Sequence, residues 1–439
     1  MARDADGLVD HGTRLTRALV LHPEMQADRA RRDPGPRLEE ALALARALPG
    51  LEIAGGAVVP VRDARPGTLF GPGKLSELKD RIEREEVELV VIDGPVTPVQ
   101  QRNLEKAWKA KVLDRTGLIL EIFADRAATR EGVLQVDLAA LAYQRTRLVR
   151  AWTHLERQRG GSGGVGGFTG GPGETQIEAD RRAIDEQMVR LRRQLGKVTR
   201  TRDLHRAARA KVPYPVVALV GYTNAGKSTL FNRLTGADVM AKDMLFATLD
   251  PTMRAVTLAT GDDVILSDTV GFVSDLPTQL VAAFRATLEE VLSADLVLHV
   301  RDIAHAETEE QAADVEAILH DLGVAEDTPR IEVWNKADLL PPAGEEAALA
   351  QAERRDDVAL ISARTGQGVD ALLARVSGIL GAARAREAVT LPTADGAARA
   401  WLYDAGVVAG EDLSEDGTTT TLTVDWTPAQ AARFAKRQP

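Results

Sequence analysis

Residues 221 to 228 carry the most specific chemical pattern of the chain, two glycines followed by a lysine and a serine in the order G-x-x-x-x-G-K-S. The run PYPVVALV precedes the pattern and TLFNRL follows it, which predicts a buried strand, a loop and a helix. In that setting loop amides face phosphate oxygens, Lys227 neutralises the β- and γ-phosphates, and the Ser228 hydroxyl ligates Mg²⁺. The predicted phosphate-binding loop is Gly221, Tyr222, Thr223, Asn224, Ala225, Gly226, Lys227 and Ser228.

A carboxylate and a glycine suited to the terminal phosphate occur in the sequence DTVG, directly after the strand-like run DVILS. Asp268 is predicted to hold Mg²⁺ through water, and the Gly271 amide to meet the γ-phosphate. Asp-Gly turns are common, so DTVG alone is unspecific, but its order and distance from the phosphate loop fit a P-loop enzyme. The predicted contacts are Asp268, Thr269, Val270 and Gly271.

The segment between these motifs lacks a clear strand pattern and suits a switch that orders only around a γ-phosphate. Thr248 is the predicted second protein ligand of Mg²⁺, after the loop serine. Thr252 is the alternative, and ordinary turn hydrogen bonding would be its structural role. The predicted switch contacts are Phe246, Ala247, Thr248, Leu249 and Asp250. The predicted catalytic residues are Lys227, Thr248 and Gly271.

Selection of the base is predicted from the sequence NKAD, which directly follows the strand-like run RIEVW. An aspartate carboxylate can accept both N1-H and N2-H of guanine, whereas adenine offers no such pair, so GTP should be preferred to ATP. The triplet SAR, after VALI, is expected to close the pocket with a backbone amide on guanine O6, although alone it also fits a simple turn. The predicted contacts are Asn335, Lys336, Ala337, Asp338, Ser362, Ala363 and Arg364.

The residue after the DTVG glycine, Phe272, occupies the position at which many GTPases place a glutamine that orients the attacking water. A phenyl ring can neither donate nor accept a hydrogen bond. Intrinsic turnover should therefore be slow, at or below roughly 10⁻³ s⁻¹ on the scale of small GTPases. A partner is expected to supply the missing group.

The elements that must position these residues require several domains, because 439 residues exceed a single core. The predicted fold class is α/β, with a P-loop GTPase domain between two smaller parts. A small α/β subdomain with a long antiparallel helical hairpin precedes it, and a small α/β appendage follows it. The predicted ranges are 15–110 for the subdomain, 111–212 for the hairpin, 213–385 for the GTPase domain and 390–439 for the appendage.

Apolar runs and helical periodicity predict the smaller parts. Strands are expected at 18–21, 51–60 and 87–93, and helices at 36–48 and 74–86. The loop holding Gly71, Gly73 and Lys74 fits a turn that caps a helix, or a second phosphate site. In the appendage ADGAARAWLYDAG and TPAQAARFAKRQ are expected to be helices and TTTTLTVDW a strand.

Two helical stripes of apolar residues, from Leu134 to Leu155 and from Ile184 to Val198, predict helices that pair antiparallel. Their connector, residues 160–173, is rich in glycine and longer than such a link requires, which favours a functional loop over a solvated linker. Guanidinium groups match phosphate, so RNA is the predicted partner, the alternative being a solvated charged face. The flanking arginines are Arg145, Arg147, Arg150, Arg157, Arg159, Arg181 and Arg182.

Composition removes several classes of function. There is no cysteine, so disulfides, thiolate metal sites and cysteine nucleophiles are excluded. Neither an apolar run long enough for a membrane span nor a secretory signal is recognisable, so a cytoplasmic location is expected. The net charge of −10 argues against polyanion binding in general and against DNA, but Lys and Arg outnumber Asp and Glu more than twofold over residues 140–211.

Taken together, GYTNAGKSTLFNRLT, LFATLDPT, LSDTVGFVSDLP and GGSGGVGGFTGGPGETQIE closely resemble the HflX family of ribosome-associated GTPases. The resemblance covers about residues 15–385. It implies binding to the large ribosomal subunit at its peptidyl-transferase region, and GTP-dependent splitting of stalled or stress-arrested ribosomes. It further implies stimulation of GTP hydrolysis by ribosomal RNA of that subunit, with a monomer expected off the ribosome.

Three other functions stay open at this stage. A large-subunit assembly GTPase would bind immature subunits without splitting ribosomes. An RNA-remodelling NTPase would bind ATP at the Gly71 to Lys74 turn and clamp RNA with the hairpin. A tRNA-modification GTPase is disfavoured because no catalytic cysteine is present.

Overall fold

The computed structural model forms two compact units, one built on residues up to Arg192 together with Phe246, the other on residues from Arg193 onward. The structure describes residues 15–25, 33–159, 172–209, 214–237, 246, 252–274, 290–325, 327–382, 385–414, 416–426 and 428–435.

The first unit begins with a four-stranded parallel sheet in the order β2-β1-β3-β4. Strands alternate with helices along the chain, which is the pattern that builds parallel sheets. Helices α2 and α3 pack together, as do α1 and α4, and Leu19 and Leu21 belong to the same core as Leu78 of α2 and Leu104 of α3. The elements are β1 (Thr16–Met25), α1 (Pro34–Ala47), β2 (Leu51–Val61), α2 (Pro72–Arg84), β3 (Leu89–Ile92), α3 (Pro98–Trp108), β4 (Lys111–Asp114) and α4 (Arg115–Arg126).

The sheet extends beyond the predicted end of the subdomain at residue 110, because β4 pairs with β3 along its whole length. The three predicted strands and two predicted helices are present as β1 to β3 and α1 and α2. Helix α3, strand β4 and helix α4 were not predicted. Strand β4 has only four residues and begins with Lys111, so its apolar signal in the sequence is short.

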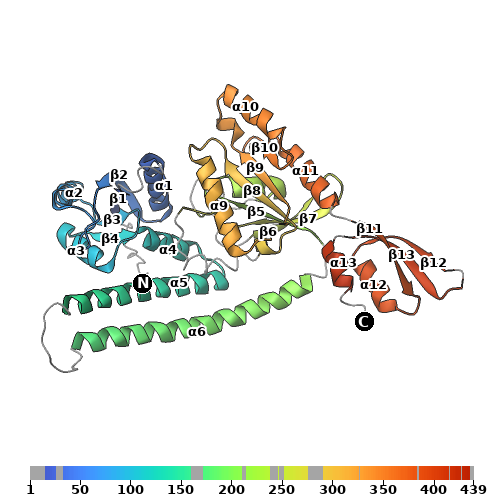
Figure 1. The fold of residues 1–439 in the computed structure, drawn as a ribbon, viewed down its shortest axis with the longest axis horizontal. Coiled ribbons are helices and arrows are strands. Elements are labelled where there is room, and N and C mark those ends of the chain that lie inside the picture. The colour runs from blue at the N-terminus through green and yellow to red at the C-terminus, as the bar shows by residue number, and fades with distance from the viewer. Residues whose placement is uncertain are drawn as a thin grey trace, which may run out of the picture. The chain divides into compact units, whose positions relative to one another are not determined.

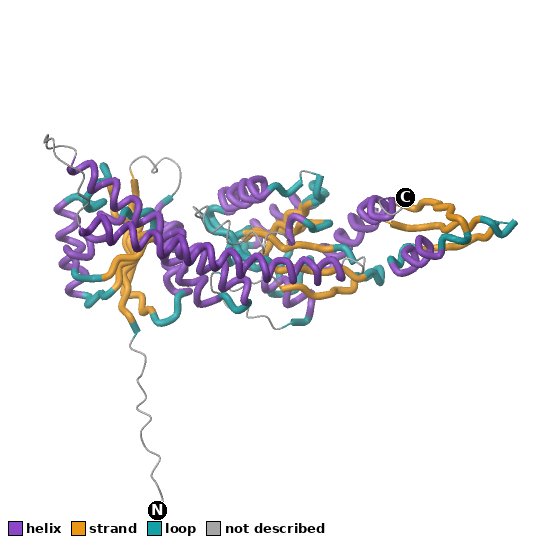
Figure 2. Tube along the Cα trace, turned by 90° about the horizontal axis from the view of Figure 1, so that it is seen from below, coloured by secondary structure: helices purple, strands orange, loops and turns teal. Residues whose placement is uncertain are grey.

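Two long helices follow, α5 (Arg130–Arg159) and α6 (Pro172–Arg209). They lie side by side in Figures 1 and 2, and Arg145 of α5 forms a 2.6 Å ion pair with Asp185 of α6. Leu134 and Met188, one from each predicted stripe, are buried. The glycine-rich connector lies outside the described residues as far as position 171, and α6 already includes the last two positions of the predicted loop.

The second unit contains a six-stranded sheet in the order β10-β9-β8-β5-β7-β6, parallel except for β6. Its central strands β5 and β8 are buried on both faces, as the apolar run PYPVVALV predicted for β5. The elements are β5 (Val216–Gly221), α7 (Lys227–Thr235), β6 (Thr252–Thr257), β7 (Asp263–Asp268), β8 (Leu296–Asp302), α9 (Thr308–Leu322), β9 (Arg330–Asn335), the 3-10 turn η1 (Ala337–Leu339), α10 (Pro342–Ala352), β10 (Val358–Leu360) and α11 (Val369–Ala382).

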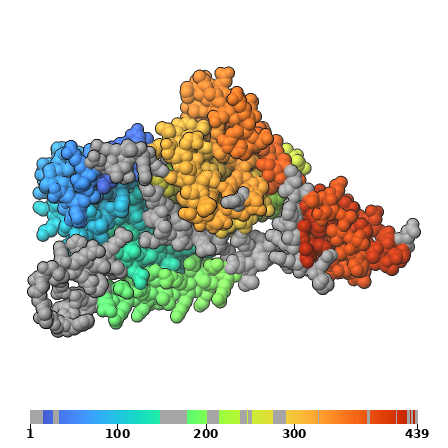
Figure 3. Space-filling model, viewed as in Figure 1, coloured from blue at the N-terminus to red at the C-terminus, as the bar shows by residue number. Residues whose placement is uncertain are grey.

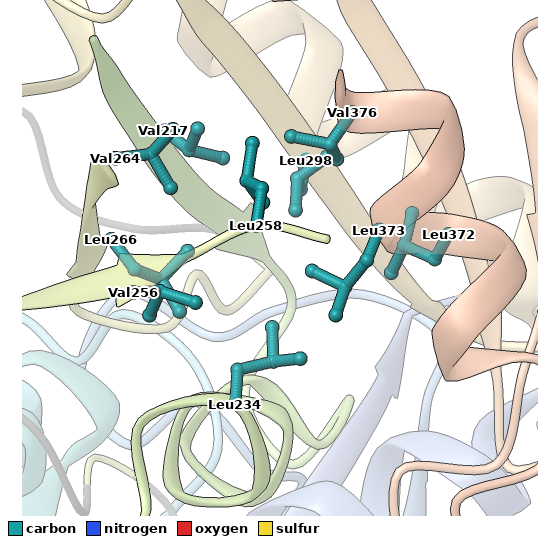
Figure 4. A pocket seen from close by; sticks show the side chains of 10 residues that line it. All are labelled: Val217, Leu234, Val256, Leu258, Val264, Leu266, Leu298, Leu372, Leu373 and Val376. Atoms are coloured by element: carbon teal, nitrogen blue, oxygen red, sulfur yellow. The ribbon is translucent and has the colours of Figure 1, made fainter. Parts of the chain in front are cut away.

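The core of this sheet packs against α7 and α11 and leaves a small, partly open apolar pocket of about 10 Å³ between them (Figure 4). Side chains from four strands and both helices point into it, among them Val217, Leu234, Leu266 and Val376. A cavity with only apolar walls offers no hydrogen-bond partner and stays dry. It is therefore a packing void and not a binding site.

The C-terminal part has a three-stranded antiparallel sheet in the order β11-β13-β12 with its own core. Trp426 and Phe434 pack there at 5.5 Å between ring centroids. Its first strand begins at Ala385, before the predicted start at 390, and the predicted strand and two helices are present as β13, α12 and α13. The elements are β11 (Ala385–Pro392), α12 (Gly396–Asp404), β12 (Val408–Leu413), β13 (Thr419–Trp426) and α13 (Pro428–Ala435). The predicted α/β fold class is confirmed.

Candidate nucleotide-binding site

The predicted phosphate loop connects the end of β5 to the start of α7. Only glycine suits the backbone at its two glycine positions, because φ is positive at both: +149° at Gly221 and +95° at Gly226. A Cβ at Gly221 would lie 2.1 Å from the Val300 carbonyl oxygen, and one at Gly226 would lie 2.2 Å from Nδ2 of Asn335. The loop backbone therefore passes close to its neighbours, as a loop that presents amides to a ligand requires.

Lys227 is enclosed by this loop. Its Nζ donates to the carbonyl oxygens of Gly221 at 3.1 Å and Tyr222 at 2.8 Å. Burial lowers the pKa of Lys227 to about 8, and the charge of Asp268 opposes this effect. A phosphate at the loop would add negative charge beside the ammonium group and favour its protonated form.

Ser228 and Asp268 meet at the start of α7. The Ser228 Oγ donates to Oδ2 of Asp268 at 2.8 Å, and the aspartate is fully buried. A hydroxyl and a carboxylate are the hard oxygen ligands that Mg²⁺ accepts. Elsewhere in the described ranges no group of three or more His, Asp and Glu side chains could hold a metal by itself.

The DTVG segment lies directly against the phosphate loop. The Thr223 amide donates to the Phe272 carbonyl at 2.7 Å, and the Phe272 amide donates to the Gly221 carbonyl at 3.1 Å. Gly271 leaves no room for a side chain, since a Cβ there would lie 2.9 Å from the Thr223 Cα of the phosphate loop and 3.0 Å from Lys227 Nζ. The Gly271 backbone is thus beside the lysine that is predicted to bind the terminal phosphates. Thr269 and Val270 are buried beneath, and the Thr269 hydroxyl donates to the Leu219 carbonyl.

The base-selecting motifs are brought together around Asn335. Its Nδ2 donates to the Ala225 carbonyl at 2.8 Å, and its Oδ1 accepts from the Ala363 amide at 2.9 Å. Asp338 receives a 2.6 Å hydrogen bond at Oδ1 from the Ser362 hydroxyl, which fixes its carboxylate. The other two residues of NKAD support the turn: Lys336 pairs with Asp302, and the Ala337 amide donates to the Ile361 carbonyl.

Two side-chain contacts that the sequence did not predict hold these loops, one from Tyr222 of the predicted phosphate loop and one from Arg233. The Tyr222 hydroxyl accepts from the Ser274 amide at 2.6 Å. Arg233, in the last turn of α7, donates to the carbonyl oxygens of Ala363 and Arg364. Their partners are backbone atoms 52 and about 130 positions away, so no side-chain pattern in the sequence could reveal them.

The predicted switch is described only at its first residue. Ala247, Thr248, Leu249 and Asp250 lie outside the described residues. Phe246 has φ of +58° and is buried, and its ring packs edge-on against Phe123 of α4 at 4.6 Å between centroids. Its side chain thus belongs to the core of the first unit.

The turn at Gly71 lies at the start of α2. Gly71 caps α2, and the Lys74 ammonium pairs with Glu77 of the same helix at 2.6 Å. These contacts match the interpretation of a turn that caps a helix.

A parallel sheet with a glycine loop before α7, a Ser-Asp pair for Mg²⁺ and a fixed aspartate for guanine defines a P-loop GTPase. Residues 216–336 match the family model of a 50S ribosome-binding GTPase. Residues 36–124 and 126–209 match the N-terminal and middle regions of a GTP-binding GTPase, and 347–438 match the HflX C-terminal domain. The chain belongs to the HflX family of GTPases.

Similar proteins cover nearly the whole chain. GTPase HflX of Magnetococcus marinus is 50% identical over 404 residues, which are 92% of this chain and 91% of that protein. GTPase HflX of Escherichia coli is 42% identical over 378 residues, 85% of this chain and 86% of that protein. The predicted family and the predicted hydrolysis of GTP are confirmed. No helix in the described part of the chain has the length and apolar character to cross a bilayer.

Proposed function

We propose that the protein binds the large ribosomal subunit and splits stalled or stress-arrested ribosomes in a GTP-dependent step, with hydrolysis to GDP and phosphate releasing it. The observation that carries this proposal is the row of exposed arginines on α6 in a chain of net charge −10. Figure 3 shows the side chains of α6, in green, at the surface. A GTPase domain of the ribosome-binding type supports the choice of partner.

Two of the predicted RNA-binding arginines, Arg147 and Arg181, differ in their surroundings, and the side chains of Arg150, Arg157 and Arg159 lie outside the described residues. Arg147 is half-buried and pairs with Asp114, Tyr143 and Gln101, so it fastens α5 to the sheet of the first unit. Arg181, at the other side of the loop, is exposed. Further along α6 the exposed arginines are Arg190, Arg192, Arg193 and Arg200. These side chains, with the glycine-rich connector, are the proposed contacts to ribosomal RNA.

Mg²⁺ is proposed to bind with GTP at Ser228 and Thr248, with Asp268 holding it through water. The 2.8 Å contact between Ser228 and Asp268 supports the first part of this assignment. The ion would neutralise charge on the β- and γ-phosphates. Ordering of Thr248 around it would couple nucleotide state to ribosome binding.

The large subunit is also the proposed source of the group that orients water. Phe272 is fully buried, and its backbone is bonded to the phosphate loop at both its amide and its carbonyl. Its side chain therefore offers nothing to a water molecule. A group added in trans can raise turnover by about 10³ to 10⁵. Equal rates of GTP turnover with and without large subunits would remove this part of the proposal.

Sedimentation of intact ribosomes with the protein and GTP, GDP or ATP tests the function directly. Free subunits are expected with GTP only. Deletion of residues 160–173 should spare GTP binding and abolish splitting, whereas Arg147→Ala, which acts on the fold, should also lower thermal stability. Ribosomes that stay intact with GTP, while immature large subunits bind, would replace splitting with an assembly role.

A further inference from the structure

The Arg233 side chain donates two hydrogen bonds to the backbone of the loop Ser362–Arg364, which is predicted to contact the base. Its Nε donates to the Ala363 carbonyl and its Nη2 to the Arg364 carbonyl, each at 2.6 Å. Both bonds come from a charged donor, which makes them stronger than bonds between neutral groups. The fork of the guanidinium group sets the direction of two consecutive carbonyls at once.

Fixing a carbonyl also fixes the next amide. A trans peptide is planar, so the carbonyl of Ala363 and the amide of Arg364 point in opposite directions. With the carbonyl turned to Arg233, the Arg364 amide faces away from it. The Ala363 amide is held as well, since it donates to Oδ1 of Asn335 at 2.9 Å. The loop backbone is therefore held by Arg233 at its carbonyls and by Asn335 at the Ala363 amide.

The packing around the guanidinium group is close. A Cβ at Gly366 would lie 2.7 Å from Arg233 Nη1, and φ at this glycine is +96°. The glycine lets the loop turn over the arginine. Arg233 also shares α7 with Lys227, roughly 9 Å further along the axis at 1.5 Å per residue. Helix α7 thus carries Lys227 of the phosphate loop at its start and Arg233, which holds the loop Ser362–Arg364, near its end.

We propose that Arg233 is a positioning residue for guanine recognition: it holds the loop Ser362–Arg364 so that a backbone amide of the loop meets O6 of the base. Arg233 acts through the loop and does not touch the nucleotide. The proposal rests on the assignment of O6 to this loop, and not on any role at the ribosome. Asp338, held by Ser362, serves the N1 and N2 side of the same base.

The test compares GDP with 6-thio-GDP, whose sulfur is a weak acceptor in place of O6 and whose N1-H and N2-H remain. In Arg233→Ala, affinity for GDP should fall about tenfold, and affinity for 6-thio-GDP at most about twofold, because the bond through O6 is already weak. Calorimetry on the full chain measures both. Arg233→Lys keeps the charge but lacks the fork, so it should lie between wild type and the alanine variant.

Two variants separate positioning from general damage. Arg254→Ala removes an exposed arginine of β6 and should bind both nucleotides as wild type does. Ser362→Ala releases Asp338 and should weaken both nucleotides equally. If Arg233→Ala weakened the two nucleotides equally, or weakened neither, the proposal would be overturned. Should the alanine variant fail to fold, the same comparison on Arg233→Lys decides.

Discussion

The chain builds two parallel sheets from alternating strands and helices, and it uses their carboxyl ends in different ways. In the first unit this edge is closed by charges that satisfy one another: Asp93 bonds to His22 at 2.7 Å and to Arg115 at 2.6 Å, and Arg115 also reaches Glu40. In the second unit glycine loops leave backbone groups and a lysine facing the edge. Ligands bind at this edge in α/β folds, but only where the residues leave donors for them.

The largest effect should come from matched lysine substitutions in the two units. Lys227→Ala is expected to weaken GTP binding at least about a hundredfold, since the charged donor to the phosphates is lost. Lys74→Ala, at the other turn that joins glycine to lysine, removes only a surface pair with Glu77 and should change neither GTP nor ATP binding. Calorimetry with both nucleotides measures this. ATP binding that survives in Lys227→Ala and disappears in Lys74→Ala would restore the second nucleotide site.

Asp93→Asn should damage the first unit alone. Removing one partner of a buried ion pair destabilises by about 3 kcal/mol, so hydrogen exchange in β1 and β3 should accelerate while GTP affinity stays unchanged. Burial opposes ionisation, yet the bonds from His22 and Arg115 hold the pKa of Asp93 below its usual range. Its contribution is therefore present above the unfolded pKa and lost as pH falls through the folded value. Unchanged exchange in both strands would show that the cluster is not needed for stability.

GTP affinity should fall as pH rises, whereas the contribution of Asp93 to stability is lost as pH falls. The pKa of Lys227 is lowered to about 8, and phosphate binding favours the charged form, so affinity is full below about pH 8. Above that value it should fall by up to about tenfold per pH unit. Asp93→Asn should follow the same curve, because its site lies in the other sheet. A flat curve from about pH 7 to 9 would mean that Lys227 stays charged throughout.

The smallest effect is expected from Tyr222→Phe. The Tyr222 hydroxyl holds the Ser274 amide, and Gly271 lies against Lys227, where a γ-phosphate needs space. Without this bond the segment from Gly271 to Ser274 can move away from the phosphate loop. The affinity for GTP relative to GDP should then rise about threefold, a change in free energy no larger than that of one hydrogen bond. Stopped-flow titrations with fluorescent nucleotides give the ratio. An unchanged ratio would show that this bond does not oppose the γ-phosphate.

The sequence predicted the parts of the site that are local in the chain. The phosphate loop, DTVG and NKAD each follow a strand, so their spacing carries the geometry. Contacts between distant segments could not be predicted: the support from Arg233 goes to backbone atoms, and Arg147, predicted to contact RNA, pairs with Asp114 instead. In the fold, the short strand β4 was missed because four residues carry too little periodicity.

The close approach of the backbone at Gly221 limits which residues can replace this glycine. Two neighbouring strands, β5 and β8, come so near at their ends that even one methyl group would strike the Val300 carbonyl oxygen. No compensating change in a side chain can relieve this, because the obstacle is main chain. In a saturation library selected for nucleotide binding, position 221 should retain glycine alone, while Asn224, exposed in the same loop with φ of +60°, should also accept glycine and aspartate.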